Sequence, residues 1–410
     1  MIKILVVEDQ AEKRLKIISH LTSLDGIGID NIEHADNVID AKRLLKRTKY
    51  SLLVLDINIP LRSDQATARG GGLELITFIR TNIQAIPPSY IFGMTAYDDA
   101  FSAASAEFSS ALWKLVMFDP EDNSWMESLT AAVAFLVSRH CPPFENDGTT
   151  YHFDVGVVVA LEEELAPFRE LLEDWREVPV AYDPARYFTG KIQRGSGYAT
   201  VVAVASPRMG LPTAAVTTTK LIISFRPRYL ITSGICAGVK EKTQIGDILV
   251  SDPCFDWGSG KWVASDSGAL TFRPAAYPWR LSESLRREVA ALGEKSDLLS
   301  NLARGFNGGR PSNVPVVIID AMASGGSVLQ AEALMADVRA QHKNLIGIDM
   351  ESYGVLTAAE YCGAPPPRAI AVKSVCDFGD GEKNDSFHAY AARVSASFAV
   401  ELVRRLEFDD

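Results

Sequence analysis

Acidic side chains follow two apolar runs near the carboxyl end of the chain, where carboxylates could act on a bound ligand. Asp349 and Glu351 come after the run LIGI, and Asp377 and Asp380 follow a second run, AIAVKSVC. Both runs are typical of buried strands, and the segment between them has a helical pattern. Carboxylates at the mouth of a buried sheet are costly unless they are paired or used. Because ligands of open α/β sheets bind at the carboxyl ends of strands, we interpret these acids as two walls of an active site.

The first third of the chain has another set of polar residues at the ends of apolar runs. Glu8 and Asp9 follow IKILVV, Asp56 ends YSLLVLD, Thr95 ends SYIFGMT, and Lys114 lies in the short run ALWKLV. Helical segments separate these runs, which is the pattern of a doubly wound α/β domain with a parallel sheet. We therefore expect three acids, a hydroxyl and an amine at one edge of that sheet.

This set resembles the receiver domain of two-component response regulators, over about residues 1–139. The resemblance implies a flavodoxin-like fold in which Glu8, Asp9 and Asp56 hold Mg²⁺ and Asp56 accepts a phosphoryl group. Thr95 and Lys114 would contact that group. The residue types suit this chemistry, because hard cations take oxygen ligands and a carboxylate can form an aspartyl phosphate. The implied partner is an upstream sensor histidine kinase or phosphorelay protein.

Two features depart from the receiver pattern. Leu115 stands where receivers usually have a proline, and the loop of residues 58–72 is longer than usual. We therefore expect an atypical switching geometry, or a domain that binds or senses without rapid phosphate turnover. The alternative is an ordinary doubly wound domain with polar strand ends.

Several blocks in the rest of the chain together resemble the nucleoside phosphorylase and nucleosidase superfamily. They are VGVVVALEEEL, TSGICAGVKEKTQIGDILVSD, ASGGSVL, and IDMES followed by KSVCDFGD. The resemblance covers residues 153–406. It implies an α/β domain with a central mixed sheet, which assembles into homo-oligomers.

By this resemblance, Asp377 would protonate or hydrogen-bond purine N7 and so make the base a better leaving group. Glu351 would hold the ribose hydroxyls and stabilise the oxocarbenium-like sugar. Glu164 would deprotonate the attacking water, while Asp349 and Lys373 would support these acids. The alternative for each residue is a structural salt bridge. Acids in a first helical turn are also favoured as caps.

Two features favour hydrolysis over phosphorolysis. Three consecutive carboxylates, ending with Glu164, would repel inorganic phosphate in a partly buried site. In the superfamily, a serine that helps to hold phosphate or water often stands where this chain has Ile235. A purine substrate attacked by water is therefore the preferred interpretation.

The remaining candidate substrate contacts come from three further segments. Gly234 belongs to the turn TSGICAGV, whose small residues let the backbone approach a ligand closely. Val328 and Leu329 would face the purine and Met350 would flank the sugar, with core packing as the alternative for these three. Arg208 is a candidate for 5′-phosphate contact, with a solvated surface charge as its alternative.

The composition sets the size and number of domains. At 410 residues, with 47% hydrophobic and 23% charged, the chain is long enough for two domains with separate cores. We expect a receiver-like domain at residues 1–140 and a catalytic domain at residues 153–410. The segment between them, residues 141–152, contains prolines, glycine and small polar residues and is expected to be a linker.

Charge and cysteine usage exclude several classes of protein. The formal net charge of −11 disfavours non-specific binding to nucleic acid or anionic membranes. Apolar runs are too short for a membrane span, and the amino terminus becomes acidic too soon for a secretory signal, so we expect a cytoplasmic protein. The five scattered cysteines argue against a disulfide framework or a zinc site. We expect no cofactor for the glycosidase chemistry.

A receiver joined to a phosphorylase-like domain resembles the effectors of Detocs-type antiphage systems, which cleave the N-glycosidic bond of ATP. This resemblance gives the hypothesis of a phosphorylation-gated N-glycosidase. It would convert ATP or dATP to adenine and (deoxy)ribose triphosphate in antiphage defence. One alternative is an adenosine-type nucleosidase or purine nucleoside phosphorylase with a regulatory receiver. Another is a non-catalytic, nucleotide-binding signalling module.

Overall fold

The computed structural model describes residues 2–25, 27–65, 70–139, 141–264, 270–327, 332–379 and 385–408. The chain forms two compact units, Met1–Cys141 and Pro142–Asp410. Each unit has its own sheet and its own apolar core. The two are described separately.

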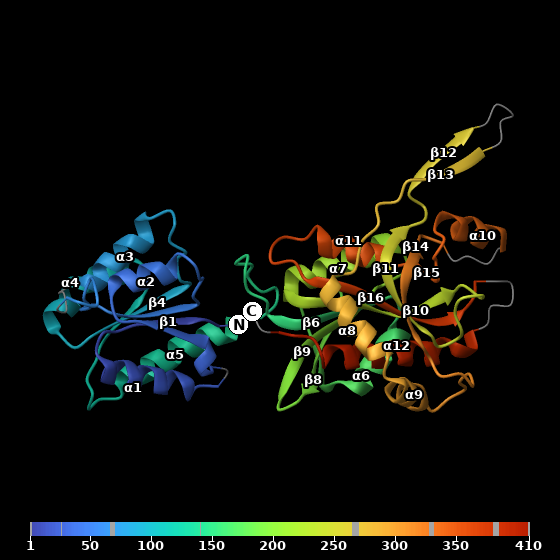
Figure 1. Cartoon of the computed structure of the whole chain (residues 1–410). Helices are drawn as coiled ribbons and strands as arrows, with labels where there is room; N and C mark the ends of the chain where they lie inside the picture. Colours follow the sequence, from blue (N-terminus) through green and yellow to red (C-terminus); the bar gives the residue numbers. More distant parts are fainter. Residues whose placement is uncertain are drawn as a thin grey trace. The chain divides into compact units, whose positions relative to one another are not determined.

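The amino-terminal unit is a five-stranded parallel sheet in the order β2-β1-β3-β4-β5, with helices on both faces. Helices α2, α3 and α4 cover one face, and α1 and α5 cover the other (Figure 1). The elements are β1 Ile4–Val7, α1 Ala11–Thr22, β2 Ile32–Ala35, α2 Val38–Leu45, β3 Leu52–Asp56, α3 Gly71–Thr81, β4 Tyr90–Thr95, α4 Asp98–Ser110, β5 Lys114–Met117 and α5 Ser124–Arg139. Burial on both faces explains the continuous apolar runs of the central strands. This order and parallel pairing are compatible with a flavodoxin-like fold.

The carboxyl-terminal unit is built on a nine-stranded mixed sheet in the order β15-β14-β11-β16-β10-β6-β9-β8-β7. Most neighbouring pairs are parallel, while β11 with β16, β8 with β9 and β7 with β8 are antiparallel. The strands are β6 Phe153–Val159, β7 Glu173–Val178, β8 Tyr187–Arg194, β9 Gly197–Ala205, β10 Pro227–Gly238, β11 Ile248–Asp256, β14 Val317–Ser324, β15 Gly347–Asp349 and β16 Arg368–Asp377. The predicted α/β fold with a mixed sheet is thus confirmed for this unit.

Helices cover both faces of this sheet. Figure 1 shows α7 and α11 on one face and α6, α8, α9 and α12 on the other, in agreement with two separate apolar clusters. The helices are α6 Glu162–Leu171, α7 Leu211–Phe225, α8 Glu283–Gly293, α9 Ser296–Arg304, α10 Glu332–Gln341, α11 Ser352–Glu360 and α12 His388–Val403. Among these helices, α12 is buried along most of its length, so its small and apolar residues lie in the core. In the part of the chain that the structure describes, no helix has the length and apolar character to cross a membrane.

The short strand β15 closes one end of the sheet. It pairs with β14 in parallel and with the end of β10 in antiparallel, where Ala237 lies opposite Ile348. The strands β10, β16, β11, β14 and β15 therefore form a small closed ring. A register shift after Cys236 bends β10 toward β15. The carboxyl ends of β10, β15 and β16, which carry the predicted site residues, are brought together by this closure.

The segment predicted as a linker packs on the carboxyl-terminal unit. The ring of Phe144 stacks on His152 with centroids 4.5 Å apart and lies edge-on to Phe225 of α7. The backbone N–H of Phe144 donates to the carbonyl of Ser224 at 3.0 Å. Residues 142–152 are therefore a packed extension of the second unit.

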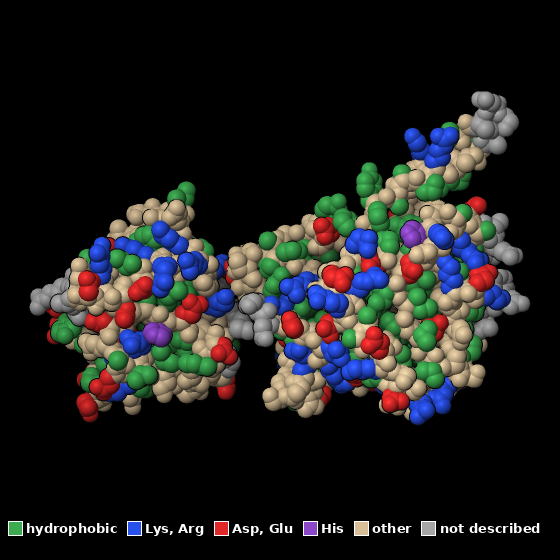
Figure 2. Space-filling view, in the orientation of Figure 1, with side chains coloured by type: hydrophobic (Ala, Val, Ile, Leu, Met, Phe, Trp, Pro, Cys, Tyr) green, Lys and Arg blue, Asp and Glu red, His purple; other side chains and the backbone are tan. Residues whose placement is uncertain are grey.

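A two-stranded ribbon, β12 Gly260–Ala264 with β13 Leu270–Pro274, projects from the carboxyl-terminal unit (Figure 1). The space-filling view shows apolar and basic side chains on it (Figure 2). Trp262 is exposed at one face of the ribbon and packs on Phe272, with ring centroids 5.3 Å apart. On the faces of the two units shown in Figure 2, basic and acidic side chains are interspersed.

The close packing of α11 on α7 gives a first prediction. A Cβ added to Gly354 would lie 2.5 Å from the backbone carbonyl oxygen of Leu211. Gly354→Ala should therefore destabilise the carboxyl-terminal unit by about 1–3 kcal/mol, the usual cost of overpacking. Thermal and urea unfolding would measure the change. Gly309→Ala is the matched control, because a Cβ there meets nothing within 4 Å; equal stability of the two variants would contradict the packing.

Candidate active site

A cavity of about 130 Å³ lies at the closed end of the mixed sheet. The three acids predicted to be catalytic, Glu164, Glu351 and Asp377, all line it. They come from the first turn of α6, the cap residue of α11 just after β15, and the end of β16. Methionines 209, 335 and 350 supply apolar lining. The fold thus brings three carboxyl groups, far apart in sequence, to one partly apolar hollow.

Glu164 is buried at the amino end of α6. Its Oε2 accepts hydrogen bonds from the N–H groups of Ala160 at 2.7 Å and Leu161 at 3.0 Å. Its Oε1 accepts from the N–H of Ile235 at 2.8 Å. These three donors fix the carboxylate, and two of them make it part of the helix cap. The amide of the glycine-rich turn therefore serves Glu164 and is not left for an anion.

Gly234 makes room for this carboxylate. Its φ is +148°, and a Cβ at this position would overlap Oε1 of Glu164. Its N–H donates to Oγ of Ser395 at 3.0 Å, which ties β10 to α12. Gly234 is not among the described residues that line the cavity. Its contribution is the close approach of Glu164, where the sequence had predicted a substrate contact.

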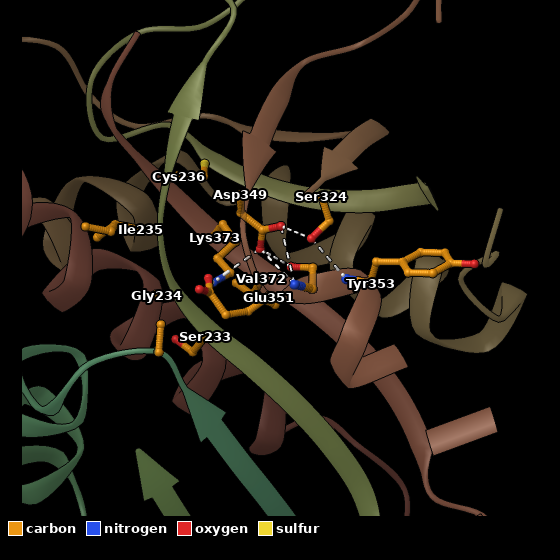
Figure 3. A network of polar contacts seen from close by, with 12 residues as sticks. Ser233, Gly234, Ile235, Cys236, Ser324, Asp349, Glu351, Tyr353, Val372 and Lys373 are labelled. Atoms are coloured by element: carbon orange, nitrogen blue, oxygen red, sulfur yellow. Dashed lines mark hydrogen bonds and ion pairs between the residues drawn. The ribbon is translucent and has the colours of Figure 1, made fainter. Parts of the chain in front are cut away.

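A buried ammonium lies beneath two of the acids. Nζ of Lys373, on β16, is 3.3 Å from Oδ2 of Asp349 and 3.7 Å from Oε2 of Glu351, and its side chain is fully buried. Figure 3 shows the three side chains pointing toward one another. Oδ1 of Asp349 also accepts from Oγ of Ser324 at 2.7 Å. Oε1 of Glu351 accepts from the N–H of Gly210 at 3.0 Å.

The burial of this network changes its protonation. Burial lowers the pKa of Lys373, but Asp349, Glu351 and Glu164 raise it, and the net pKa lies above the ordinary value. Burial raises the pKa of Glu351, against the opposing effect of Lys373. An ionised Glu351 is therefore costly in the free site. A positive charge that develops on a bound ligand would lower that cost, so the site favours such a charge.

Asp377 is the last residue of β16 and lines the cavity. Its Oδ1 accepts from the N–H of Gly379 at 2.8 Å, and its Oδ2 lies 3.4 Å from Sγ of Cys376. Nε2 of His388 is 4.0 Å from the same Oδ2. His388, at the start of α12, lines the cavity and was missed by the sequence analysis. The sequence signal that could have identified it is a histidine at the start of the helix that follows a strand ending in an acid.

The other residues predicted to contact the substrate do not all lie at the cavity. Met350 lines the cavity, as does Asp349. Arg208 is exposed and is not among the described lining residues, although its neighbour Met209 is. Val328 and Leu329 lie outside the described residues. Ser327, which is described, lines the cavity.

The acids of the amino-terminal unit also come together. Glu8 and Asp9 follow β1, Asp56 ends β3, and carboxylate oxygens of the three lie within 4.8 Å of one another. Thr95 is fully buried at the end of the neighbouring strand β4. Lys13, which the sequence analysis did not single out, reaches the same pocket from α1. Its Nζ is 2.7 Å from Glu8 and 2.5 Å from Asp56.

This pocket offers the oxygen ligands that Mg²⁺ prefers, but the ammonium already holds two of them. Lys13 contacts one oxygen of Glu8 and one oxygen of Asp56, which are two of the three acids predicted to hold the metal ion. As the side chains are arranged, they suit a monovalent ammonium and do not fit a divalent cation. The prediction that Glu8, Asp9 and Asp56 hold Mg²⁺ therefore meets a physical obstacle.

Lys114 does not reach the acidic pocket, which corrects the prediction made for it. It lies opposite Phe92 at the start of β5, whereas Met117 lies opposite Thr95. Three residues of extended strand span about 10 Å, so Lys114 lies at the other edge of the sheet. It is exposed and borders a hollow with residues of α5. The sequence analysis had expected this amine at the same edge of the sheet as the three acids.

Comparison with known proteins then assigns the carboxyl-terminal unit. Residues 154–406 match the family described as the phosphorylase superfamily, which is more than half of the chain. The chain belongs to the phosphorylase superfamily. The family that the sequence blocks indicated is thus confirmed. Membership, together with nucleosidase relatives, also confirms the expectation of an enzyme of the N-glycosidase type.

Three relatives show how far the similarity extends. Protein y4jS of Sinorhizobium fredii, described as uncharacterized, is 29% identical over 98% of this chain and 99% of its own length. ATP nucleosidase Cap17 of Escherichia coli is 26% identical over 60% of this chain and 50% of Cap17. This chain therefore spans about half the length of Cap17.

The third relative is similar over nearly its whole length. The 5′-methylthioadenosine/S-adenosylhomocysteine nucleosidase of Haemophilus influenzae is 26% identical over 62% of this chain and 99% of that enzyme. A solved structure of the Neisseria meningitidis nucleosidase of the same name is 20% identical over 62% of this chain and 99% of its own, with a TM-score of 0.46.

The buried ion pair gives a second prediction. Lys373→Met should destabilise the carboxyl-terminal unit by about 3–5 kcal/mol, because two carboxylates lose the charge that compensates them. The loss should be smaller at acid pH, where protonation removes the uncompensated charge. Unfolding at several pH values would measure it. Lys220→Met, which removes an exposed lysine paired with Asp183, should cost less than about 1 kcal/mol.

The close approach of Gly234 gives a third prediction. Gly234→Ala should lower kcat/KM for release of free base by about 10²-fold, because a displacement of about 1 Å in a reacting group has effects of that size. The added methyl group must push the Glu164 carboxylate from its place. Gly197→Ala, at a turn where the nearest atom is 4.0 Å from the added Cβ, is the control. Wild-type kinetics for Gly234→Ala would refute the assigned geometry.

Proposed function

We propose that the carboxyl-terminal unit hydrolyses the N-glycosidic bond of purine nucleotides, converting ATP or dATP to adenine and (deoxy)ribose triphosphate. The observation that carries this proposal is the convergence of Glu164, Glu351 and Asp377 on one cavity with apolar lining. Three carboxyl groups suit a reaction in which the sugar becomes positively charged, the attacking water loses a proton and the leaving purine gains one. The apolar surface suits a purine ring.

In the proposed reaction, water attacks C1′ of the ribose while the bond from C1′ to N9 of the base breaks. Asp377 gives a proton to N7, so that the bonding electrons leave with a neutral base. Glu164 takes a proton from the water, and that proton is returned through solvent to Asp377. Glu351 contacts the ribose hydroxyls and offsets the positive charge of the sugar. Water therefore supplies the new hydroxyl group on C1′.

The arrangement supports attack by water in preference to phosphate. The N–H of Ile235 is engaged by Glu164 at 2.8 Å, and Lys373 is engaged by Asp349 and Glu351. Among the described residues that line the cavity, His388 is the basic side chain. An inorganic phosphate at this place would meet carboxylates at short range and few donors to balance them.

Similarity to Cap17 supports a nucleotide as substrate. The matched region covers 60% of this chain, although it is half of Cap17. The 5′ phosphates need cationic partners, and exposed Arg208 and Lys240 lie close in sequence to Met209 and Ala237, which line the cavity. These two side chains are the described candidates for the triphosphate.

A nucleoside substrate is the second candidate. The methylthioadenosine/adenosylhomocysteine nucleosidase of H. influenzae matches this chain over 99% of its own length. Met209 and Met350 give the cavity an apolar part that could accept an uncharged 5′ group. This alternative requires no cation beside the 5′ position.

We also propose that the amino-terminal unit gates the enzyme when Asp56 is phosphorylated by an upstream kinase, as part of antiphage defence. A five-stranded parallel sheet with Glu8, Asp9, Asp56 and Thr95 at one edge supports this part. An enzyme that destroys ATP would harm its own cell if it were always active, which gives a reason for a gate. Homo-oligomeric assembly, expected from the family resemblance, is a further part of the proposal.

The purified full chain, with and without acyl-phosphate treatment, should be incubated with ATP, adenosine or 5′-methylthioadenosine, and the products identified by mass spectrometry. We expect adenine and ribose triphosphate from ATP, independent of added inorganic phosphate. Asp377→Asn should lower the rate by about 10²- to 10⁴-fold, the range for a positioned general acid. Asp174→Asn removes an exposed acid paired with Lys191 and should leave the rate unchanged.

A different result would contradict each part of the proposal. Cleavage of the two nucleosides but not of ATP would show that the substrate is a nucleoside and not a nucleotide. A strict requirement for inorganic phosphate would exclude hydrolysis. Full activity of Asp56→Asn, without treatment, would remove the gate while leaving the glycosidase intact. No free base from any substrate under either condition would overturn the proposed activity.

A further inference from the structure

In the acidic pocket of the amino-terminal unit, Glu8 and Asp56 each have a backbone amide and an ammonium close to them. Oε1 of Glu8 accepts from the N–H of Gln10 at 2.9 Å, and Oε2 lies 2.7 Å from Nζ of Lys13. Oδ1 of Asp56 accepts from the N–H of Asn58 at 2.9 Å, and Oδ2 lies 2.5 Å from the same Nζ. Each carboxylate is therefore held by one backbone amide and by the shared ammonium.

The lysine is built into the pocket and is not a surface side chain that happens to reach it. Its side chain is 5% exposed, and those of Glu8 and Asp56 are 1% and 6% exposed. Lys13 belongs to the buried face of α1, together with Ile17 and Leu21. A buried ammonium is costly unless carboxylates balance it, so its position between two acids is specific.

An aromatic ring completes the enclosure of this ammonium. Nζ of Lys13 lies 4.9 Å from the ring centroid of Phe118, within the range of a cation–π interaction. Phe118 directly follows β5, and its N–H donates to the carbonyl of Thr95 at 2.8 Å. Phe118 thus occupies the end of β5 beside the acids, the place where the sequence analysis had expected an amine. The amine comes from α1 instead.

We propose that Lys13 is the resident cation of this pocket, which takes the place of a divalent metal ion and excludes it. The expectation of Mg²⁺ bound by Glu8, Asp9 and Asp56 is thereby replaced for the state described. The cation that pairs with Glu8 and Asp56 is supplied by the chain itself. This inference concerns the amino-terminal unit alone and does not depend on the glycosidase chemistry.

The exclusion follows from geometry and charge. Mg²⁺ needs six oxygen ligands at about 2.0–2.1 Å, in a nearly octahedral arrangement. An ammonium that lies between Glu8 and Asp56 would stand among those ligands and repel the metal ion. Lys13 would have to leave first. Because it lies in the first turn of α1, on the face packed against the core, its departure would expose buried apolar surface.

Cation binding by the purified full chain tests the proposal. Mg²⁺ and Mn²⁺ should be titrated separately by calorimetry, with manganese binding also followed by electron paramagnetic resonance. The wild-type chain should show no saturable site below millimolar concentration. Lys13→Met should gain a site with an affinity at least about tenfold higher, equivalent to about 1.4 kcal/mol. Adding Asp56→Asn to that variant should abolish the gained site and so place it in the pocket.

Thermal unfolding of the amino-terminal unit gives an independent readout. Without metal, Lys13→Met should unfold at a lower temperature than wild type, and Mg²⁺ should restore much of the loss. Mg²⁺ should not change the wild-type transition. Lys16→Met is the matched control, since Lys16 lies on the same helix but is 40% exposed. Its unfolding temperature and metal binding should equal those of the wild type.

If Lys13→Met does not fold, Glu8→Gln combined with Lys13→Met keeps the test decisive. That pair removes one negative and one positive charge and leaves Asp9 and Asp56 to bind a metal ion. Micromolar Mg²⁺ binding by the wild-type chain would overturn the proposal. So would equal, undetectable binding by the wild type and by every folded variant that lacks Lys13, because another feature would then exclude the metal.

Discussion

The carboxyl-terminal unit depends on one buried ammonium, that of Lys373, held between Asp349 and Glu351. These acids could not lie side by side away from water without a positive charge beneath them. The sheet supplies that charge from β16, while Asp349 ends β15 and Glu351 follows it as the cap of α11. Closure of the ring of strands by β15, which pairs with both β14 and β10, keeps the three groups in register. The cavity is therefore a consequence of charge balance within the sheet.

Both units place a lysine between two acids at the carboxyl edge of a sheet, but they use it differently. Lys373 lies below the acids, so Glu351 still borders the cavity. Lys13 lies among the acids and takes one oxygen from each of Glu8 and Asp56. In the first arrangement Glu351 still borders the cavity, where a ligand could reach it. In the second, Lys13 is paired with one oxygen of Glu8 and one of Asp56. The position of the ammonium thus differs between the two sites, since it lies beneath the acids in one and between them in the other.

The sequence correctly predicted the features that depend on local residue patterns. Apolar runs that end in acids predicted strand ends, so Glu351 and Asp377 could be placed at one edge of a sheet, while Glu164 was assigned from the family resemblance. It failed where tertiary contacts decide. Lys13 lies in AEKRLK, which resembles any solvated helix face, and only the fold turns it inward. Lys114 was misplaced because a short apolar run does not show which of its residues begins the strand.

Glu164 has two physical tasks, since the carboxylate that borders the cavity also closes the first turn of α6 through Ala160 and Leu161. Replacing it would loosen that turn as well as remove the acid from the hollow. Substitution at this position is thus disfavoured by folding alone, whatever the carboxylate does at the cavity. A survey of tolerated substitutions that measures protein abundance alone would find position 164 intolerant even in a lineage that had abandoned the reaction.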